Sequence, residues 1–463
     1  MFLTPPLRPA PTIEIMTSFP DRRDPIDVAA VIERSGFGRL QATVLTLCLL
    51  SMVTDGFDVQ ALAYTAPSIV REWGVKSSVL GPVLAAANVG VLVGSLGLSV
   101  VADRIGRRPV LIGATVMFAV VTLLTARATS IGELEVLRFL AGIGLGTIAP
   151  NVSALVGEYC SSRLRPTMIM VVGVGLTAGA AVGGFIAAAL IPAYGWRSVF
   201  YFGGAVPLVI VIAMIAWLPE SLPLMALWRR DKARLAGWLN RIDPTVGATA
   251  HSLFVVPERP ERRPVRGLFE EGRGPATVLF WAVNFMNLLA LYSLSLWLPT
   301  VARDAGFDSA TSVLIGTTFQ VGGTIGTFGL AWLVARFGFV RMLGVSFVIA
   351  AISTGLIGQP GLSLPVLFLV VFVAGWCVVG SQPGLNALSG AYYPTPVRST
   401  GVGAGLGVGR IGAIVGPVIG GQLVGAHWIT RDLFLAAALP PLLAAIVMVG
   451  LARVLGTRMG RSR

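Results

Sequence analysis

Residues 97–108 read GLSVVADRIGRR, and residues 329–340 read GLAWLVARFGFV. The second segment begins 232 residues after the first and keeps Gly97, Arg104 and Gly106 at equivalent places. Around both segments, proline, tyrosine and arginine match at an offset of 232 or 233 as well as glycine. The clearest pairs are Pro67 with Pro299, Gly142 with Gly375, Pro150 with Pro383, Tyr159 with Tyr392 and Arg165 with Arg398. The chain is therefore predicted to contain two homologous halves.

Composition places both halves in a membrane. Of the 463 residues, 55% are hydrophobic and 12% are charged, with a mean hydropathy of +0.80, whereas roughly a quarter of a soluble chain is charged. Twelve apolar stretches are long enough to cross a bilayer, and lipid-exposed segments of this kind must be helical. They lie near 40–69, 78–101, 109–127, 132–158, 167–191, 198–218, 275–300, 310–334, 340–358, 363–390, 399–425 and 432–455. We expect an all-α integral membrane protein built from two six-helix bundles.

These stretches also set the predicted domain boundaries. The two bundles are expected at 39–218 and 275–455, separated by a polar central loop at 219–274 that is rich in arginine and proline. Tails are expected at 1–38 and 456–463. A chain with this plan needs no second copy to complete it, so we expect a monomer.

The net charge of +13 reflects orientation in the membrane. Of the 35 lysines and arginines, 27 fall in the two tails, the central loop and the loops on the same side, and six fall on the opposite side. This asymmetry follows the positive-inside rule, which predicts that both termini are cytoplasmic in a bacterial-type inner membrane. The basic balance is therefore no indication of nucleic-acid binding. The three cysteines and two histidines have no metal-ligand spacing, so no metal or cofactor is expected.

Two acids stand within the first predicted helix, at Asp55 and Asp58 of the sequence DGFD. Their spacing of three places them on one helix face, and acids at membrane depth face a cavity or a partner because exposure to lipid is costly. The second half has Asn287 and an alanine at the equivalent positions. We predict that both acids carry protons and that Arg138 pairs with one of them until it is protonated. A static structural pair is the alternative.

An anion site is predicted in the second half. Arg410 lies within a predicted helix, where the first half has threonine, and a planar, permanently charged guanidinium suits a carboxylate. A role in helix packing or gating is the alternative. Four polar side chains of the second half are further candidates for lining a pocket, although packing is the more common role for each alone: Asn287, Tyr292, Gln382 and Asn386.

Charged residues near the cytoplasmic loops are candidates for a gate. Asp103 can face a partner cation or the positive N-terminal end of the eleventh predicted helix, and Gly106 permits a tight turn. Glu158 is expected to pair with Arg107 or Arg165. The full set of predicted gating residues is Asp103, Arg104, Gly106, Arg107, Arg108, Glu158, Arg165 and Arg398.

The opening segment resembles the loop signature of the major facilitator superfamily, and its second copy is a decayed version. Several longer stretches are similar to the aromatic acid:proton symporter family within it: TDGFDVQALAYTAPSIVREWG from Thr54, PNVSALVGEYCSSRLRPTM from Pro150, YSLSLWLPTVARDAGF from Tyr292 and YPTPVRSTGVGAGLGVGRIGAIVGP from Tyr393. The resemblance implies import of a small aromatic or other organic acid with protons by alternating access. It also implies that the acids of the first helix, Asp103, Arg398 and Arg410 are needed for uptake. Some members use a histidine in the second half, where this chain has only His427, near the outer end of a predicted helix, so that feature cannot be transferred.

The same residues fit other functions less well. A drug or metabolite:proton antiporter usually carries G-x-x-x-G-P-x-x-G-G in the fifth helix, where this chain reads GAAVGG, and the full pattern occurs instead from Gly412. A sugar porter shares the loop signature and the sequence PES at 219–221, but the acid pair and Arg410 suit an anion better. A non-transporting membrane sensor would need a large soluble domain. No nucleophile–base constellation supports an enzyme.

Overall fold

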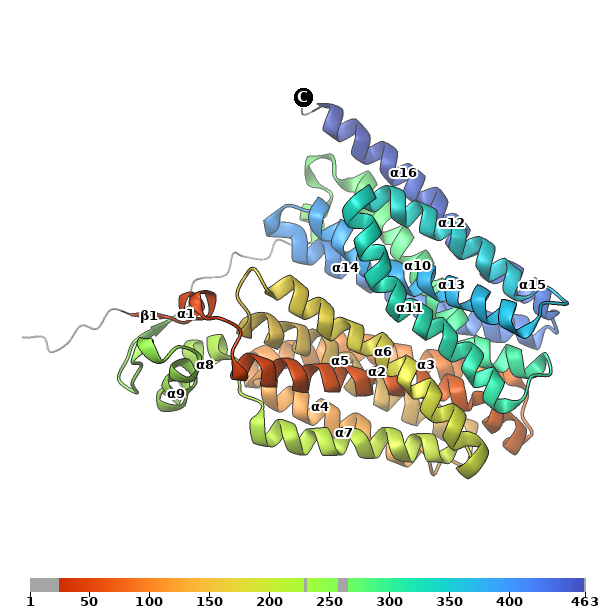
Figure 1. Cartoon of the computed structure of the whole chain (residues 1–463), viewed down its shortest axis with the longest axis horizontal. Coiled ribbons are helices and arrows are strands. Elements are labelled where there is room, and N and C mark those ends of the chain that lie inside the picture. The colour runs from red at the N-terminus through yellow and green to blue at the C-terminus, as the bar shows by residue number, and fades with distance from the viewer. Residues whose placement is uncertain (1–24, 229–230, 257–264, 462–463) are drawn as a thin grey trace, which may run out of the picture.

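The computed structural model of the chain describes residues 25–228, 231–256 and 265–461. Most of the predicted N-terminal tail and part of the central loop therefore lie outside the described residues. Within them, twelve helical segments are long and apolar enough to cross a membrane. They form two bundles of six, which appear in Figure 1 as the lower and upper halves of the molecule.

The spans of the first bundle are α2 (Arg39–Trp73), α3 (Leu80–Ile105), α4 (Arg107–Thr125), α5 (Ile131–Tyr159), α6 (Arg165–Tyr194) and α7 (Arg197–Trp217). Those of the second bundle are α10 (Gly274–Asp304), α11 (Ser309–Phe337), α12 (Phe339–Ile357), α13 (Leu364–Tyr392), α14 (Thr395–Gly425) and the pair α15 (Thr430–Ala437) and α16 (Leu439–Arg461). The predicted two-bundle, all-helical membrane fold is confirmed.

The repeated glycines mark places where helices touch in both halves. A Cβ on Gly142 would lie 2.2 Å from the backbone oxygen of Ala87, and one on Gly375 would lie 2.0 Å from that of Phe319. These contacts pack α3 on α5 and α11 on α13. Only glycine permits such close approach of backbones, so the repeated glycines show that α3 packs on α5 in the same way as α11 packs on α13.

Gly106 is the whole connection between α3 and α4, and its φ of +113° is one that residues with a side chain avoid. Gly338 joins α11 to α12 in the same way, with a φ of +87°. The predicted tight turn is therefore present in both halves.

Three segments differ from the sequence-based expectation. The central loop is partly folded, into α8 (Leu222–Trp228), α9 (Lys232–Ile242) and β2 (Phe254–Val255). α9 is amphipathic and buries Leu235 and Leu239. The central loop is polar on average, but these apolar residues at helical spacing stabilise a packed helix within it. The predicted C-terminal tail continues as helix to Arg461, because no proline follows Leu455 to interrupt the hydrogen-bond ladder.

The predicted N-terminal tail also contains structure. β1 (Ile26–Asp27) pairs in parallel with β2, and α1 (Val28–Arg34) follows it. Asp27 caps α1, because its side chain accepts hydrogen bonds from the backbone N–H groups of Ala29 and Ala30. Together with α8 and α9, these elements lie beside one end of the first bundle (Figure 1).

Contacts between the bundles concentrate at the opposite end. Gln60 Nε2 donates to the backbone oxygen of Ser295 at 2.6 Å, and Ser295 Oγ donates to Gln60 Oε1 at 2.8 Å. A Cβ on Gly81 would lie 3.3 Å from Gly421, and Ser77 Oγ lies 3.4 Å from Asp304 Oδ2. The bundles thus meet at the end formed by the α2–α3 connection and diverge toward the end that carries α1, α8 and α9 (Figure 1).

Candidate functional site

α2 carries the acid pair in the interior of the molecule. Asp55 and Asp58 are 4% and 2% exposed. Asp58 Oδ2 accepts a hydrogen bond from Arg138 Nη1 at 3.1 Å, and Asp58 Oδ1 accepts one from Thr122 Oγ1 at 2.7 Å. Asp58 is therefore held by α4 and α5 together.

Arg138 is also almost fully enclosed, at 2% exposure. Its Nη2 donates to Thr125 Oγ1 at 2.6 Å, and its guanidinium lies 5.1 Å from the centre of the Phe200 ring. The ion pair with Asp58 is the contact expected from the sequence. Release of Arg138 on protonation stays a prediction.

Asp55 has a different environment from Asp58. Among the described residues it makes no hydrogen bond or ion pair, and its side chain lines a cavity between the bundles. Arg410 lines the same cavity from the second bundle. One acid is thus engaged by the protein, and the other faces open space.

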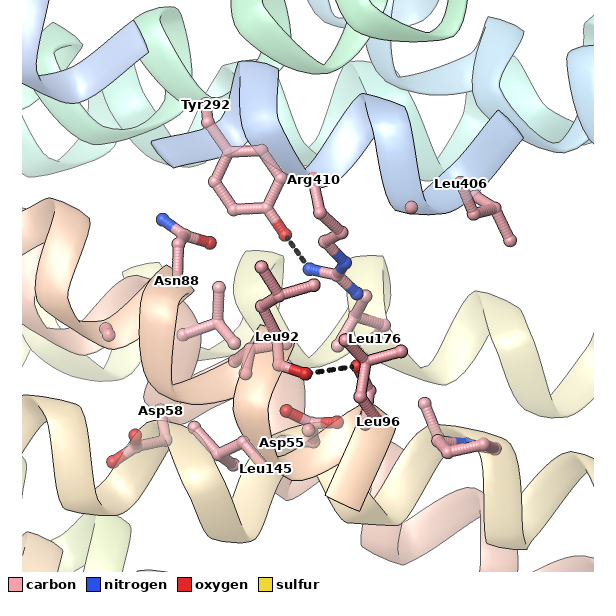
Figure 2. Close-up of a pocket in the computed structure, with 18 of the residues that line it drawn as sticks. Asp55, Asp58, Asn88, Leu92, Leu96, Leu145, Leu176, Tyr292, Leu406 and Arg410 are labelled. Carbon is pink, nitrogen blue, oxygen red and sulfur yellow. Dashed lines mark hydrogen bonds between the residues drawn. The ribbon is translucent and has the colours of Figure 1, made fainter. Parts of the chain in front are cut away.

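The cavity has a volume of about 430 Å³, within the range of small-molecule sites. α2, α3, α5 and α6 form its wall on one side, and α10 and α14 form its wall on the other. Apolar side chains dominate these walls, among them Leu62, Leu84, Leu92, Leu145, Leu176, Leu296 and Leu406. Figure 2 shows the polar residues projecting among them.

Arg410 projects from α14 toward the first bundle (Figure 2). Its Nη1 donates to the hydroxyl oxygen of Tyr292 on α10 at 3.1 Å. One cation and one phenolic hydroxyl therefore lie together on the second bundle, opposite the two acids of the first. This arrangement can bind a carboxylate on one wall while a proton occupies the other.

The amides predicted as candidates for lining the pocket contact one another. Asn287 Nδ2 donates to Gln382 Oε1 at 2.7 Å, and Gln382 Nε2 donates to Asn284 Oδ1 at 3.1 Å and to Asn386 Oδ1 at 3.3 Å. None of the four lines the cavity in this conformation. These amides hydrogen-bond to one another within the second bundle, whereas Tyr292 and Arg410 are the predicted substrate residues that line the cavity together.

The predicted gating residues gather where α3 meets α4. Arg107 is buried and donates through Nε to both Glu158 oxygens at 3.1 Å, with Nη2 2.9 Å from Glu158 Oε1. Asp103 lies 3.6 Å from Arg107, and its side chain is 62% exposed. Glu158 therefore pairs with Arg107, and the cation beside Asp103 is the same Arg107, which begins α4 just beyond the Gly106 turn.

The remaining gating candidates make backbone contacts or face outward. Arg108 Nη2 donates to the Ile215 oxygen at 2.6 Å, and Arg398 Nε donates to the Tyr393 oxygen at 3.2 Å. Arg104 and Arg165 are exposed. A gating role for any of these residues stays a prediction.

The model of the Major Facilitator Superfamily matches residues 48–256 and 280–461, which is most of the chain. The chain belongs to this superfamily. It is therefore a membrane transporter and not an enzyme.

Curated members of the superfamily resemble the chain along nearly its whole length. The 4-hydroxybenzoate transporter PcaK of Pseudomonas putida is 37% identical over 427 residues, covering 92% of this chain and 95% of that protein. The gallate transporter of Pseudomonas putida is 35% identical, with 92% and 95% covered. The 3-(3-hydroxy-phenyl)propionate transporter of Escherichia coli is 32% identical, with 89% and 93% covered.

Solved structures of the superfamily share the fold at low sequence identity. A bacterial homologue of the human lysosomal transporter Spinster, in an inward-facing and unoccupied conformation, has a TM-score of 0.68 at 16% identity, covering 90% of this chain and 98% of that chain. A point mutant of the nucleoside transporter NupG has a TM-score of 0.64 at 14% identity, with 89% and 100% covered.

Sequence reasoning missed several residues of the site. Thr122 and Thr125 complete the surroundings of Asp58 and Arg138 but look like ordinary residues of an apolar helix. Glu220, seen only as part of PES, accepts the backbone N–H groups of Arg107 and Arg108 at 2.9 and 3.2 Å and so caps α4. Asn88, the one amide in its span, lines the cavity, and this isolated amide was the available signal.

Proposed function

We propose that this transporter imports a small aromatic carboxylate together with protons by alternating access. The observation that carries the proposal is the pairing of Arg410 and Tyr292 on one wall of a mostly apolar cavity whose other wall holds Asp55. The names of the relatives support the substrate class, since they describe carriers of 4-hydroxybenzoate, gallate and benzoate.

The substrate carboxylate binds Arg410. Nη1 of Arg410 already donates to Tyr292, and its other N–H groups and the Tyr292 hydroxyl proton remain for an anion. The leucine-lined walls suit an aromatic ring, because they remove its apolar surface from water. A sugar, with hydroxyl groups around its whole ring, would leave many of them without partners on these walls.

The proton binds the acids of α2. The charged groups facing Asp55 in this part of the structure are Asp58 on α2, Arg138 on α5 and Arg410 on α14. Asp58 already accepts hydrogen bonds from Arg138 and Thr122, so Asp55 is the acid that takes the first proton from the cavity. A substrate anion on Arg410 neutralises the cation that Asp55 sees, which favours a proton on Asp55. Transfer of that proton to Asp58 would then loosen its hold on Arg138.

Alternating access uses the two bundles as rigid bodies. The described contacts between them lie at the end away from α1, α8 and α9, and the basic loops predict that this latter end is cytoplasmic. Both termini are then in the cytoplasm of an inner membrane, and this state opens toward the cytoplasm. Movement to the opposite state would bring the Asp103 loop toward the N-terminal end of α14.

The test is uptake by proteoliposomes of purified protein with radiolabelled 4-hydroxybenzoate and an acidic exterior. Accumulation above that of protein-free liposomes, abolished by a protonophore, is the expected result. Unlabelled benzoate and gallate should compete, and glucose and a cationic dye should not. Accumulation that persists after the pH gradient collapses would exclude proton symport, and absence of uptake for every aromatic acid would exclude the substrate class.

A further inference from the structure

The cavity contains one neutral amide whose function the carboxylate and proton sites leave unassigned. Asn88 lies on α3, is 5% exposed and lines the cavity. Its Nδ2 donates to the backbone oxygen of Leu84 at 3.3 Å. Since a carbonyl oxygen can only accept, this contact fixes which end of the amide faces the helix.

The other end of the amide is free. Asn88 Oδ1 accepts no hydrogen bond from the described residues, and Figure 2 shows it directed into the cavity. A polar oxygen surrounded by apolar side chains is unfavourable unless a donor reaches it. Leu84 lies one turn away on α3, and Leu296 lies one turn beyond Tyr292 on α10, both toward the end where the bundles meet.

The other hydrogen-bond acceptors that line the cavity already have partners, are assigned to the proton, or lie nearer its other end. Asp58 is taken by Arg138 and Thr122, and Asp55 is the acid assigned to the proton. Ser95 and Ser153 donate to the backbone of their own helices and lie nearer the diverging end. Apart from Tyr292, which already accepts from Arg410, Asn88 is thus the neutral side-chain acceptor of the cavity toward the end where the bundles meet.

We propose that Asn88 determines specificity by accepting a hydrogen bond from a ring hydroxyl of the substrate. With the carboxylate on Arg410 and the ring among the leucines, a phenolic O–H at the far side of the ring reaches Oδ1. Hydroxylated aromatic acids are then preferred over benzoate, and over methoxylated acids, which lack the donor. This inference rests on the proposed function, because it requires an aromatic carboxylate in the cavity.

The experiment measures binding to the purified, detergent-solubilised protein by calorimetry. Benzoate, 3-hydroxybenzoate, 4-hydroxybenzoate and 4-methoxybenzoate are compared on the wild type, Asn88→Leu and Asn151→Leu. Asn151 is a matched control: it is 2% exposed, its Nδ2 donates to the Thr147 backbone oxygen at 2.7 Å in the same i to i−4 manner, and it does not line the cavity.

Asn88→Leu should weaken binding of the preferred hydroxybenzoate by about tenfold while benzoate changes by less than about twofold. Asn151→Leu should leave the ratio between the two ligands unchanged. A ratio unaltered by Asn88→Leu would overturn the inference, as would a wild type that binds 4-methoxybenzoate as tightly as the hydroxy acids. Should Asn88→Leu fail to fold, Asn88→Ala provides the same ratio. Failure of the wild type to bind any aromatic acid would instead overturn the proposed function.

Discussion

Arg138 Nη1 lies 3.1 Å from Asp58 Oδ2, and both side chains are 2% exposed or less. The pair joins α5 to α2 and is completed by Thr122 and Thr125 on α4. A buried ion pair contributes little net stability when compared with apolar residues, but loss of one partner leaves an uncompensated charge. The pair is therefore suited to a switch, since protonation of the acid removes its attraction without removing the side chain.

Asp58→Asn should abolish proton-driven accumulation of an aromatic acid and also destabilise the protein, by about 3–5 kcal/mol, because Arg138 loses its counter-charge. The double variant Asp58→Asn with Arg138→Met should recover most of the stability and remain inactive. Thermal unfolding in detergent and proteoliposome uptake measure the two effects. Normal accumulation by Asp58→Asn would rule out a coupling role for Asp58.

Replacement of Arg410 by lysine tests the anion site. Lysine keeps the charge but lacks the planar fork that can hold Tyr292 and a carboxylate at once, so substrate affinity should fall about tenfold. Arg197→Lys is the control, because Arg197 makes a partly exposed ion pair with Glu72 away from the cavity. Equal affinities for Arg410→Lys and the wild type would assign Arg410 to helix packing.

Features that depend on residues close together in the sequence could be predicted, whereas contacts between residues far apart in the sequence could not. The match of Gly142 with Gly375 predicted two homologous halves, and it was informative because both glycines lie where helix backbones touch. Which of the two acids pairs with Arg138 could not be predicted, since both lie on one face of α2. They differ only in their contacts with α4 and α5, which supply Thr122 and Arg138 to Asp58. Likewise, the contact of Arg410 with Tyr292 joins residues 118 positions apart, and no local pattern shows that Gln382 and Asn386 hydrogen-bond to each other in this conformation.

The contact between Glu33 on α1 and Ser162 at the end of the first bundle should depend on pH. Ser162 donates to Glu33 through Oγ at 2.5 Å and through its backbone N–H at 2.8 Å, and these bonds hold the pKa of Glu33 below its usual value. The contact therefore favours the folded arrangement above the ordinary pKa of glutamate and is lost as the pH falls through the lowered value.

Glu33→Gln should mimic low pH at this contact and increase hydrogen exchange in α1 at neutral pH, while uptake stays at the wild-type rate because Glu33 is remote from the cavity. The control is Glu133→Gln, since Glu133 accepts hydrogen bonds from Thr129 in the same exposed manner at a different loop. Unchanged exchange in α1 would show that the Glu33–Ser162 contact does not hold this segment.

Asp55→Asn separates the two acids. Asp55 has no hydrogen-bond or ion-pair partner in the described part of the chain, so its neutralisation should change the free energy of unfolding by less than about 1 kcal/mol, in contrast to Asp58→Asn. Accumulation driven by a pH gradient should be lost, because the other acid of the cavity, Asp58, is already held by Arg138 and Thr122 and does not take the first proton. Exchange of labelled for unlabelled substrate across the membrane should persist, since Arg410 and Tyr292 are intact. Wild-type accumulation in this variant would move the proton site away from Asp55, and a loss of stability equal to that of Asp58→Asn would mean that Asp55 also holds the bundle together.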